Sequence, residues 1–241
     1  MSCKVARDGR LLRVTLARPE KRNALNAALC RALVDAVELA SPEDTGAIFL
    51  DAEGTAFCSG MDLSDSLQTD PAELASVHER LFTLGRRARV PIVAFVHGHA
   101  IAGGTGLVAN AHVVFATEQA RFGLTELRVA LWPFLIYRAA EDAMGPRRTL
   151  AWSLTASLFS ADEARQAGLV HSIGDAEAAL TAARELASRL PDAVRLGMKY
   201  YRESRGLDHA PSGALAASLR AELMSSPGYA EAVRQFRDRK K

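Results

Sequence analysis

The sequence has few cysteines and no long apolar run. Cys3, Cys30 and Cys58 are odd in number and show no CxxC spacing, which favours a reducing compartment, so we expect a cytoplasmic protein. The longest apolar runs, such as residues 91–96, are far too short to span a bilayer, and we expect no membrane partner. The first ten residues are charged and contain no apolar segment, so we also expect no secretory signal.

The sequence also lacks an excess of charge of either sign. Thirty basic and 28 acidic residues leave a net charge of +2, so we expect no nucleic-acid partner. The six histidines form no HExxH or similar spacing, so we expect no metal, and we assign His97 and His99 to packing or hydrogen bonding. With 49% hydrophobic residues, the 241-residue chain is typical of one large globular domain, or of a domain with a helical appendage.

Two glycine-rich stretches stand out, Gly54–Leu63 (GTAFCSGMDL) and His97–Gly106 (HGHAIAGGTG). Each follows an apolar run, over 47–51 and 91–96, and each is typical of a strand that ends in a tight turn and opens a helix. Glycine lets the backbone approach a ligand, and the first N–H groups of a helix have no internal partner. Two such turns directed at one point would form a two-donor oxyanion hole. The alternative is a pair of tight connections that bind nothing.

Periodicity predicts strands and helices in the first half and mainly helices after Phe134. The predicted strands cover 4–6, 11–16, 46–52, 91–96, 112–116 and 169–173. The predicted helices cover 27–39, 71–89, 104–109, 135–144, 147–155, 161–167, 177–190, 193–204 and 212–224. We expect Asn26, Asp70 and Ser160 to be N-caps, and we expect the polar segment 64–69 to be mobile.

Five segments, in this order, resemble motifs of the crotonase superfamily, the enoyl-CoA hydratase/isomerase family. They are 18–26 (RPEKRNALN), 54–63, 97–109 (HGHAIAGGTGLVA), 120–133 (ARFGLTELRVALWP) and 160–170 (SADEARQAGLV), and residues 236–240 are similar to the closing Phe-x-x-basic-basic pattern. The resemblance implies an α/β fold, a crotonase-like spiral of ββα units in residues 1–190 with the acyl-CoA site. It assigns residues 191–241 to a C-terminal helical trimerisation region, giving a homotrimer or a dimer of trimers. A Rossmann fold does not suit these glycines, because AGGTG is not GxGxxG.

The resemblance also implies roles for individual residues. The backbone N–H groups of Met61 and Gly103 would bind the thioester oxygen, and Glu126 would be the acid/base. The apolar residues around Glu126 would raise its pKa by desolvation, although a surface salt bridge is the alternative role. Gly106 takes the place of the second glutamate that hydratases of the family use, and glycine cannot transfer a proton.

Further positions are implied to bind the substrate. Arg22, Ala24 and Leu25 would lie near adenine and ribose, with Lys21 or Arg22 near a phosphate. The other substrate-binding positions are Ser59, Gly60, Asp62, Leu63, Gly104, Trp132, Pro133 and Phe134, with Met61, Trp132 and Phe134 as candidates for the acyl pocket. Arg239 or Lys240 would reach a phosphate of its own or of a neighbouring subunit. The CoA thioester is then a substrate, and no cofactor or metal is expected.

One glutamate is sufficient to move a double bond, because a single base can take a proton from C2 and return it to C4. Hydration is most readily explained with two carboxylates. Gly106 together with Glu126 therefore favours an enoyl-CoA isomerase over a hydratase, and the pair Pro133–Phe134 is similar to the corresponding pair in the family's single-glutamate isomerases. A hydratase with a weakened second acid, a non-catalytic acyl-CoA-binding protein and another thioester reaction stay open. Candidates for a replacement acid are Asp65, Glu141 and Asp142.

Overall fold

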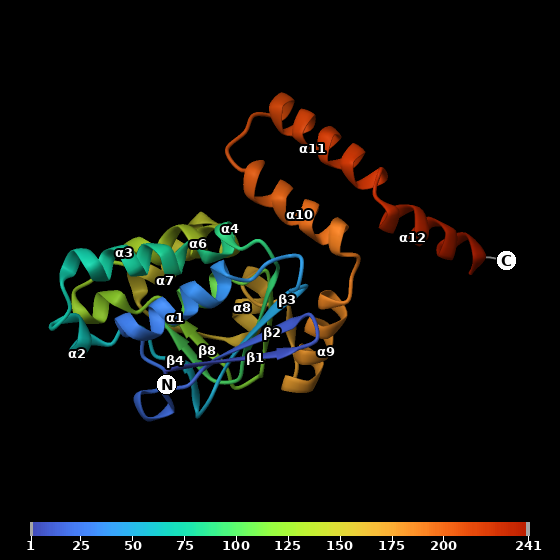
Figure 1. Cartoon of the computed structure of the whole chain (residues 1–241). Helices are drawn as coiled ribbons and strands as arrows, with labels where there is room; N and C mark the ends of the chain where they lie inside the picture. The colour runs from blue at the N-terminus through green and yellow to red at the C-terminus, as the bar shows by residue number, and fades with distance from the viewer. Residues whose placement is uncertain (1, 240–241) are drawn as a thin grey trace.

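Two β-sheets form the centre of the computed structural model, which describes residues 2–239 apart from the side chain of Ser66. The larger sheet has the strand order β1–β2–β3–β5–β7–β10, formed by Cys3–Asp8, Leu11–Leu16, Ala47–Ala52, Ile92–Val96, Val113–Ala116 and Ser172–Ile173. The smaller sheet has the order β4–β6–β8–β9, formed by Ala56–Cys58, His99–Ile101, Arg121–Gly123 and Leu158–Ser160. Three times in succession a strand of the larger sheet (β3, β5, β7) is followed by one of the smaller (β4, β6, β8). The chain therefore winds as a spiral of ββα units (Figure 1).

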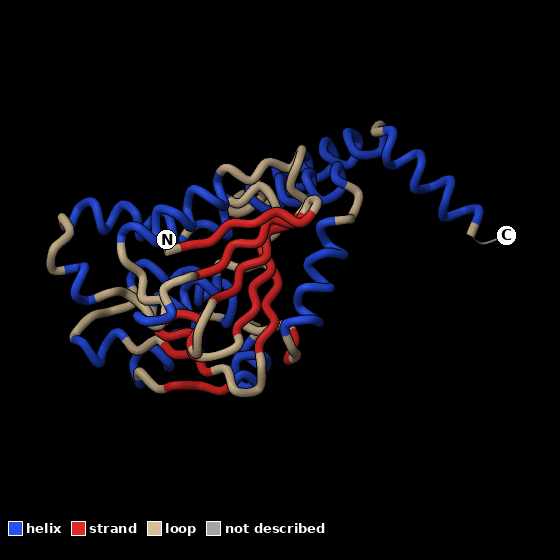
Figure 2. The backbone as a smooth tube through the Cα atoms, turned by 60° about the horizontal axis from the view of Figure 1, so that its bottom comes forward, coloured by secondary structure: helices blue, strands red, loops and turns tan. Residues whose placement is uncertain are grey.

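Alternate side chains of the larger sheet face two different hydrophobic cores. In β3, Ile48 and Leu50 belong to the main core, whereas Ala47 and Phe49 pack with helix α9 (Ala176–Ala187) on the opposite face. This alternation follows from the two-residue repeat of a strand. Figure 2 shows helices on both sides of the strands, as expected for a largely parallel sheet, in which both faces must be covered.

The helices of the body carry the predicted N-caps. The α-helices are α1 (Ala27–Glu38), α2 (Leu63–Ser66), α3 (Pro71–Phe82), α4 (Leu84–Arg87), α5 (Gly103–Ala109), α6 (Phe134–Met144), α7 (Pro146–Thr155) and α8 (Ala161–Ala167); the 3₁₀ turns are η1 (Pro19–Lys21) and η2 (Glu126–Val129). The side chain of Asn26 accepts from Leu29 N–H, that of Asp70 accepts from two N–H groups, and Ser160 forms a capping box. All three predicted caps are confirmed.

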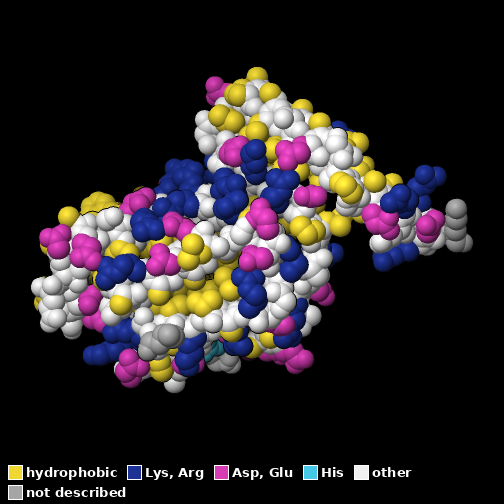
Figure 3. Space-filling view, viewed as in Figure 1, with side chains coloured by type: hydrophobic (Ala, Val, Ile, Leu, Met, Phe, Trp, Pro, Cys, Tyr) yellow, Lys and Arg dark blue, Asp and Glu magenta, His cyan; other side chains and the backbone are white. Residues whose placement is uncertain are grey.

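The last three helices extend away from this body. They are α10 (Pro191–Glu203), α11 (His209–Met224) and α12 (Pro227–Asp238), and Figure 1 shows them as an arm. Figure 3 shows hydrophobic side chains along the arm. Leu207, Met224 and Phe236 of this part of the chain are exposed. The division into residues 1–190 and 191–241 stays a prediction. Within residues 2–239 no helix combines the length and apolar character that crossing a bilayer requires.

Several predicted elements were wrong. The helix expected to reach Arg89 ends at Phe82, where Thr83 takes φ −114° and ψ 5° and its hydroxyl donates to Glu79 O at 2.8 Å. Segment 64–69 begins within helix α2, which Asp62 caps, and its expected mobility stays a prediction. Helix α12 was not predicted. Each glycine-rich stretch also contains a short strand of the smaller sheet, β4 or β6, between the first strand and the helix.

Candidate active site

The two glycine-rich turns meet in the structure. Gly60 has φ +94°, and a Cβ placed on it would lie 3.0 Å from Ile101 O and 3.6 Å from Gly103 N. Only glycine suits both this backbone conformation and this close approach. The first turn is therefore packed directly against the start of helix α5.

The turns leave two backbone donors free. Leu25 pairs with the first turn by donating to Gly60 O at 2.8 Å and accepting from Asp62 N–H at 3.0 Å, so the N–H of Met61 points away from Leu25. Gly103 is the first residue of α5, and within residues 2–239 neither its N–H nor that of Met61 has a hydrogen-bond acceptor. Ala102, with φ +50°, holds the turn in a conformation that is strained for alanine.

Hydrogen bonds from the end of strand β8 connect the segment before Glu126 to the turn at Ala102. Gly123 O, at the end of β8, accepts from Ala102 N–H at 2.7 Å. The Thr105 hydroxyl, on α5, donates to the same oxygen at 3.1 Å and also lies 3.1 Å from Gly123 N. These bonds join the segment that leads to Glu126 to the helix that begins at Gly103, so Glu126 and the Gly103 N–H are positioned together.

The Glu126 side chain is largely buried. Its Oε2 has no hydrogen-bond partner, and within the described chain the carboxylate forms no salt bridge, contrary to the alternative role. Burial raises the pKa of Glu126 from 4.5 to about 7, and a hydrogen bond from its own backbone opposes this only in part. A carboxyl group with this pKa exchanges protons readily near neutral pH.

Glu126, Met61 and Gly103 line one cavity of about 450 Å³. Six of the predicted substrate-binding residues also line it: Leu25, Ser59, Leu63, Trp132, Pro133 and Phe134. Phe134 is 78% exposed, which places it at the mouth, and Trp132 stacks on Tyr137 with ring centroids 5.9 Å apart. Among the described residues that line this cavity, Glu126 carries the only carboxyl group.

The other predicted substrate-binding residues lie outside the cavity lining: Arg22, Ala24, Gly60, Asp62 and Gly104. Arg22 O accepts from Ser59 N–H at 3.1 Å, which fixes the loop of residues 18–26 against the first turn. A Cβ on Gly104 would lie 2.3 Å from Cys58 O, so this glycine lets α5 pack on β4.

Asp62 holds the first turn in place. Its carboxylate lies 3.1 Å from the guanidinium of Arg18, and both side chains are largely buried. Burial pushes the pKa of Asp62 up, but hydrogen bonds from Arg18 and from backbone N–H groups of α2 outweigh it and keep this pKa below its ordinary value. Asp62 is therefore an anion that ties the turn to the loop of residues 18–26.

The position of the missing second acid is filled by apolar side chains. A Cβ on Gly106 would lie 2.4 Å from Ile136 Cγ2 and 3.2 Å from Phe82 Cδ1. Both of these residues line the cavity, whereas Gly106 does not. The wall that would carry a second carboxylate is therefore a hydrocarbon surface.

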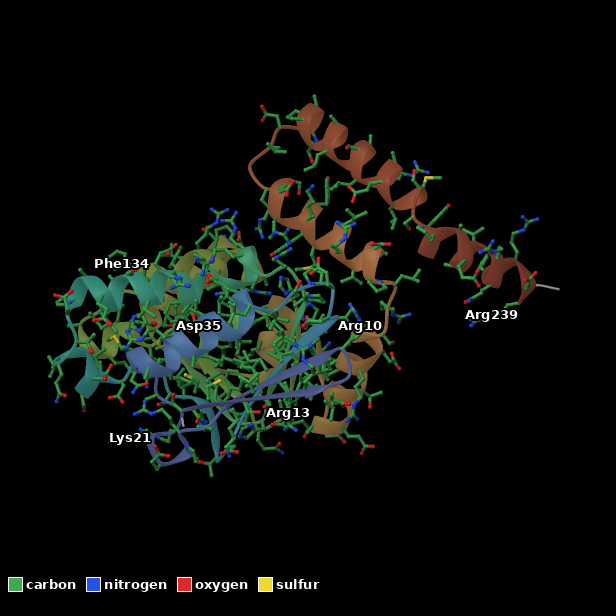
Figure 4. All side chains as sticks on the ribbon, viewed as in Figure 1. Arg10, Arg13, Lys21, Asp35, Phe134 and Arg239 are labelled. Atoms are coloured by element: carbon green, nitrogen blue, oxygen red, sulfur yellow. The ribbon has the colours of Figure 1, made fainter. Side chains whose placement is uncertain are left out.

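None of the three candidate replacement acids lines the cavity. Asp65 accepts from Ala27 N–H at 3.0 Å, and Glu141 and Asp142 form ion pairs with Arg138. Their carboxylates are engaged in structural contacts elsewhere. We also find Arg239 at the far tip of α12 in Figure 4, distant from Lys21, so it does not reach a site near Lys21 in its own chain. Lys240 lies outside the described residues.

Nine of the described lining residues were not assigned to the site from the sequence, among them His78, Phe82 and Ile136. His78 falls one helical turn after Leu74 and one turn before Phe82, on the apolar face of α3. A histidine on an otherwise apolar helix face is the signal from which His78 could have been predicted to line a site. By contrast, His97 has the structural role expected of it, with Nε2 2.9 Å from Gly54 O.

Comparison with known proteins extends this description. The model of the enoyl-CoA hydratase/isomerase family matches residues 7–239. The chain belongs to this family. This enzyme of the enoyl-CoA hydratase/isomerase family is 30% identical to enoyl-CoA hydratase EchA19 of Mycobacterium tuberculosis, over 98% of this chain and 93% of the relative. It is also 30% identical to rat mitochondrial Δ(3,5)-Δ(2,4)-dienoyl-CoA isomerase, over 77% of this chain and 63% of the relative.

The fold agrees with that assignment. A crystal structure of an enoyl-CoA hydratase from Mycobacterium smegmatis superposes with a TM-score of 0.91 at 28% identity, over 99% of this chain and 97% of the other. The crotonase fold is thus confirmed, and the protein is an enzyme of the enoyl-CoA hydratase or isomerase type. Within residues 2–239 no group of three His, Cys, Asp or Glu side chains is placed to hold a metal ion.

Proposed function

We propose that this enzyme moves the double bond of an enoyl-CoA from the 3,4 to the 2,3 position. One observation carries the proposal: Glu126 has the only carboxyl group among the described residues of the cavity wall, and Ile136 and Phe82 occupy the space in front of Gly106. A double-bond shift needs one proton acceptor that also returns the proton, and Glu126 suffices for both steps.

The proposed reaction begins with the thioester oxygen between the N–H groups of Met61 and Gly103. The Glu126 carboxylate removes a proton from C2, and the electron pair of that C–H bond moves toward the thioester oxygen to form a dienolate. Glu126 then gives the proton to C4, the carbonyl forms again, and the double bond remains between C2 and C3. Each donor of an oxyanion hole contributes about 2.7–4 kcal/mol to the transition state. A pKa of about 7 allows Glu126 to be base and acid in turn.

The rest of the substrate is assigned by position. The exposed Lys21 and Arg22 would contact the CoA phosphates, with Ala24 near the adenine and ribose, because their loop is bonded to the first turn through Ser59 N–H. The acyl chain would enter the cavity past Trp132 and Phe134. We propose that the reaction needs no metal and no cofactor besides the CoA ester itself.

Hydration is the second candidate, because the relative from Mycobacterium tuberculosis is named a hydratase. A hydratase has to hold a water molecule and remove its proton at C3. Ile136 and Phe82 give that wall no carboxylate, which is why we place hydration second.

We also propose a homotrimer, alone or paired as a dimer of trimers. The arm α10–α12 extends from the body (Figure 1), and apolar side chains such as Leu207 and Met224 are exposed there, which a neighbouring subunit would cover. Light scattering after gel filtration tests this proposal, which a monomeric mass would contradict.

A paired assay tests the reaction. Purified enzyme is given trans-3-hexenoyl-CoA or trans-2-hexenoyl-CoA, and the products are followed by mass and by absorbance of the conjugated thioester. We expect the 3-enoyl ester to become conjugated without a change in mass, and we expect Glu126→Gln to lose this activity. Gain of one water from the 2-enoyl ester would establish hydration instead. Release of free CoA, detected with a thiol reagent, would establish hydrolysis.

A further inference from the structure

Two of the described residues that line the cavity each carry a buried polar atom without a partner. Within the described residues, four buried side-chain nitrogen or oxygen atoms lack a hydrogen-bond partner: Arg10 Nε, Arg87 Nε, His78 Nε2 and Glu126 Oε2. The two arginines donate through their terminal nitrogens to backbone carbonyls. The other two atoms belong to residues that line the same cavity. A buried polar atom without a partner costs about 1–3 kcal/mol, so such an exception calls for a functional explanation.

His78 lines the cavity beside Phe82. It lies on α3, it is 6% exposed, and its ring packs against Phe82 with centroids 5.7 Å apart. Phe82 packs against the start of helix α5, because a Cβ placed on Gly103 would lie 3.1 Å from Phe82 Cζ. His78 is therefore one helical turn from the residue that packs against the thioester site.

The protonation state of His78 suits a hydrogen bond better than proton abstraction. Burial lowers the pKa of His78, and the negative charge of Asp65 opposes this only in part. The imidazole is therefore neutral at neutral pH, with one ring nitrogen as donor and the other as acceptor. Glu126, with its pKa of about 7, is the stronger base of the two and takes the substrate proton.

We propose that His78 Nε2 forms a hydrogen bond with an oxygen atom on the acyl chain, so that the preferred substrates are acyl-CoA esters with a hydroxyl or keto group. The cavity lining also contains Ser59, Thr125 and Arg128, but the side chain that packs against His78 is the apolar Phe82. A carboxylate next to Phe82 would be poorly solvated, which leaves a neutral oxygen as the matching group. The inference depends on the proposed function only in that the acyl chain occupies this cavity.

Binding of saturated esters tests the inference without any need for turnover. Hexanoyl-CoA and its 4-, 5- and 6-hydroxy derivatives are titrated calorimetrically into the full-length protein. We expect at least one hydroxy ester to bind more tightly than hexanoyl-CoA, and we expect His78→Phe to change the ratio of the two Kd values by about tenfold in favour of hexanoyl-CoA. His78→Gln should keep the preference, because its amide nitrogen reaches the position of Nε2. His78→Asn should lose it, because its shorter amide corresponds to Nδ1.

Three results would overturn the inference. They are the absence of a preference for any hydroxy ester, a preference that His78→Phe leaves unchanged, and equal ratios in the Gln and Asn variants. If His78→Phe does not fold, the comparison of Gln with Asn decides. Failure of all four esters to bind would refute the acyl-CoA site itself. A preference for hydroxy esters in an enzyme that does not isomerise would refute only the proposed reaction.

Discussion

Replacing Glu126 with glutamine should stabilise the protein while it removes the activity. In the folded state, burial raises the pKa of Glu126 from 4.5 to about 7. Above pH 7 the folded protein therefore holds a charge that the unfolded chain solvates better. At about 1.4 kcal/mol per pH unit, the difference between these pKa values corresponds to about 3 kcal/mol. Glutamine has nearly the same shape and no charge, so it should recover this free energy of unfolding.

The sign of the pH dependence follows from proton binding. Between pH 4.5 and about 7 the folded state binds more protons at Glu126 than the unfolded state does. The free energy of unfolding therefore falls as the pH rises through this range. Above about pH 7 Glu126 is ionised in both states, and its effect on the free energy of unfolding stays constant. Thermal unfolding at pH 8 should therefore give a Tm about 6–12 °C higher for Glu126→Gln than for the wild type. The gain should disappear near pH 4.5. An unchanged or lower Tm at pH 8 would refute the claim that Glu126 is buried without a partner.

The rate should follow the same ionisation. Because the carboxylate is the proposed base, the initial rate on 3-hexenoyl-CoA should rise as the pH increases through about 7 and then level off. Rates that are constant between pH 5.5 and 9 would contradict this assignment.

Three other predictions test the surroundings of the acid. Gly106→Ala should lower the free energy of unfolding by about 1–3 kcal/mol, because its Cβ would collide with Ile136. Ile136→Ala should cost less in the Gly106→Ala protein than in the wild type. If chemical denaturation shows that the two losses of unfolding free energy simply add, this contact is contradicted. Met61→Ala should keep kcat within about tenfold of the wild type, since the proposed donor is a backbone N–H, and a loss of about 100-fold or more would assign the role to the side chain. Asp62→Asn, which keeps an N-cap residue but removes the charge opposite Arg18, should cost about 1.5–3 kcal/mol of unfolding free energy, and a cost near zero would show that the ion pair is unimportant.

Local signals in the sequence predicted much of the fold. The long strands and helices follow their hydrophobic repeats, and caps such as Asn26 and Ser160 lie where side-chain chemistry placed them. The smaller sheet was missed because its strands have only three residues each, as in Ala56–Cys58, and so short a strand shows no measurable period. The resemblance in motif order was therefore needed to expect a spiral.

The same distinction between local sequence signals and tertiary packing applies to the candidate site. Met61, Gly103 and Glu126 come from contiguous motifs, and the structure places all three around one cavity. His78 and Ile136 could not be assigned to it, because they come from helices α3 and α6, whose packing on α5 is set by tertiary contacts. For the same reason the sequence showed that Gly106 lacks a carboxylate but could not show that apolar side chains fill its place.

The central claim is that Glu126 alone carries a proton from C2 to C4. It can be tested by giving the enzyme trans-3-hexenoyl-CoA deuterated at C2 and locating the label in the first product by NMR and mass spectrometry. The account predicts trans-2-hexenoyl-CoA with deuterium at C4, no added water, and no conversion by Glu126→Gln. A product heavier by one water, or equal conversion by the Gln variant, would contradict it.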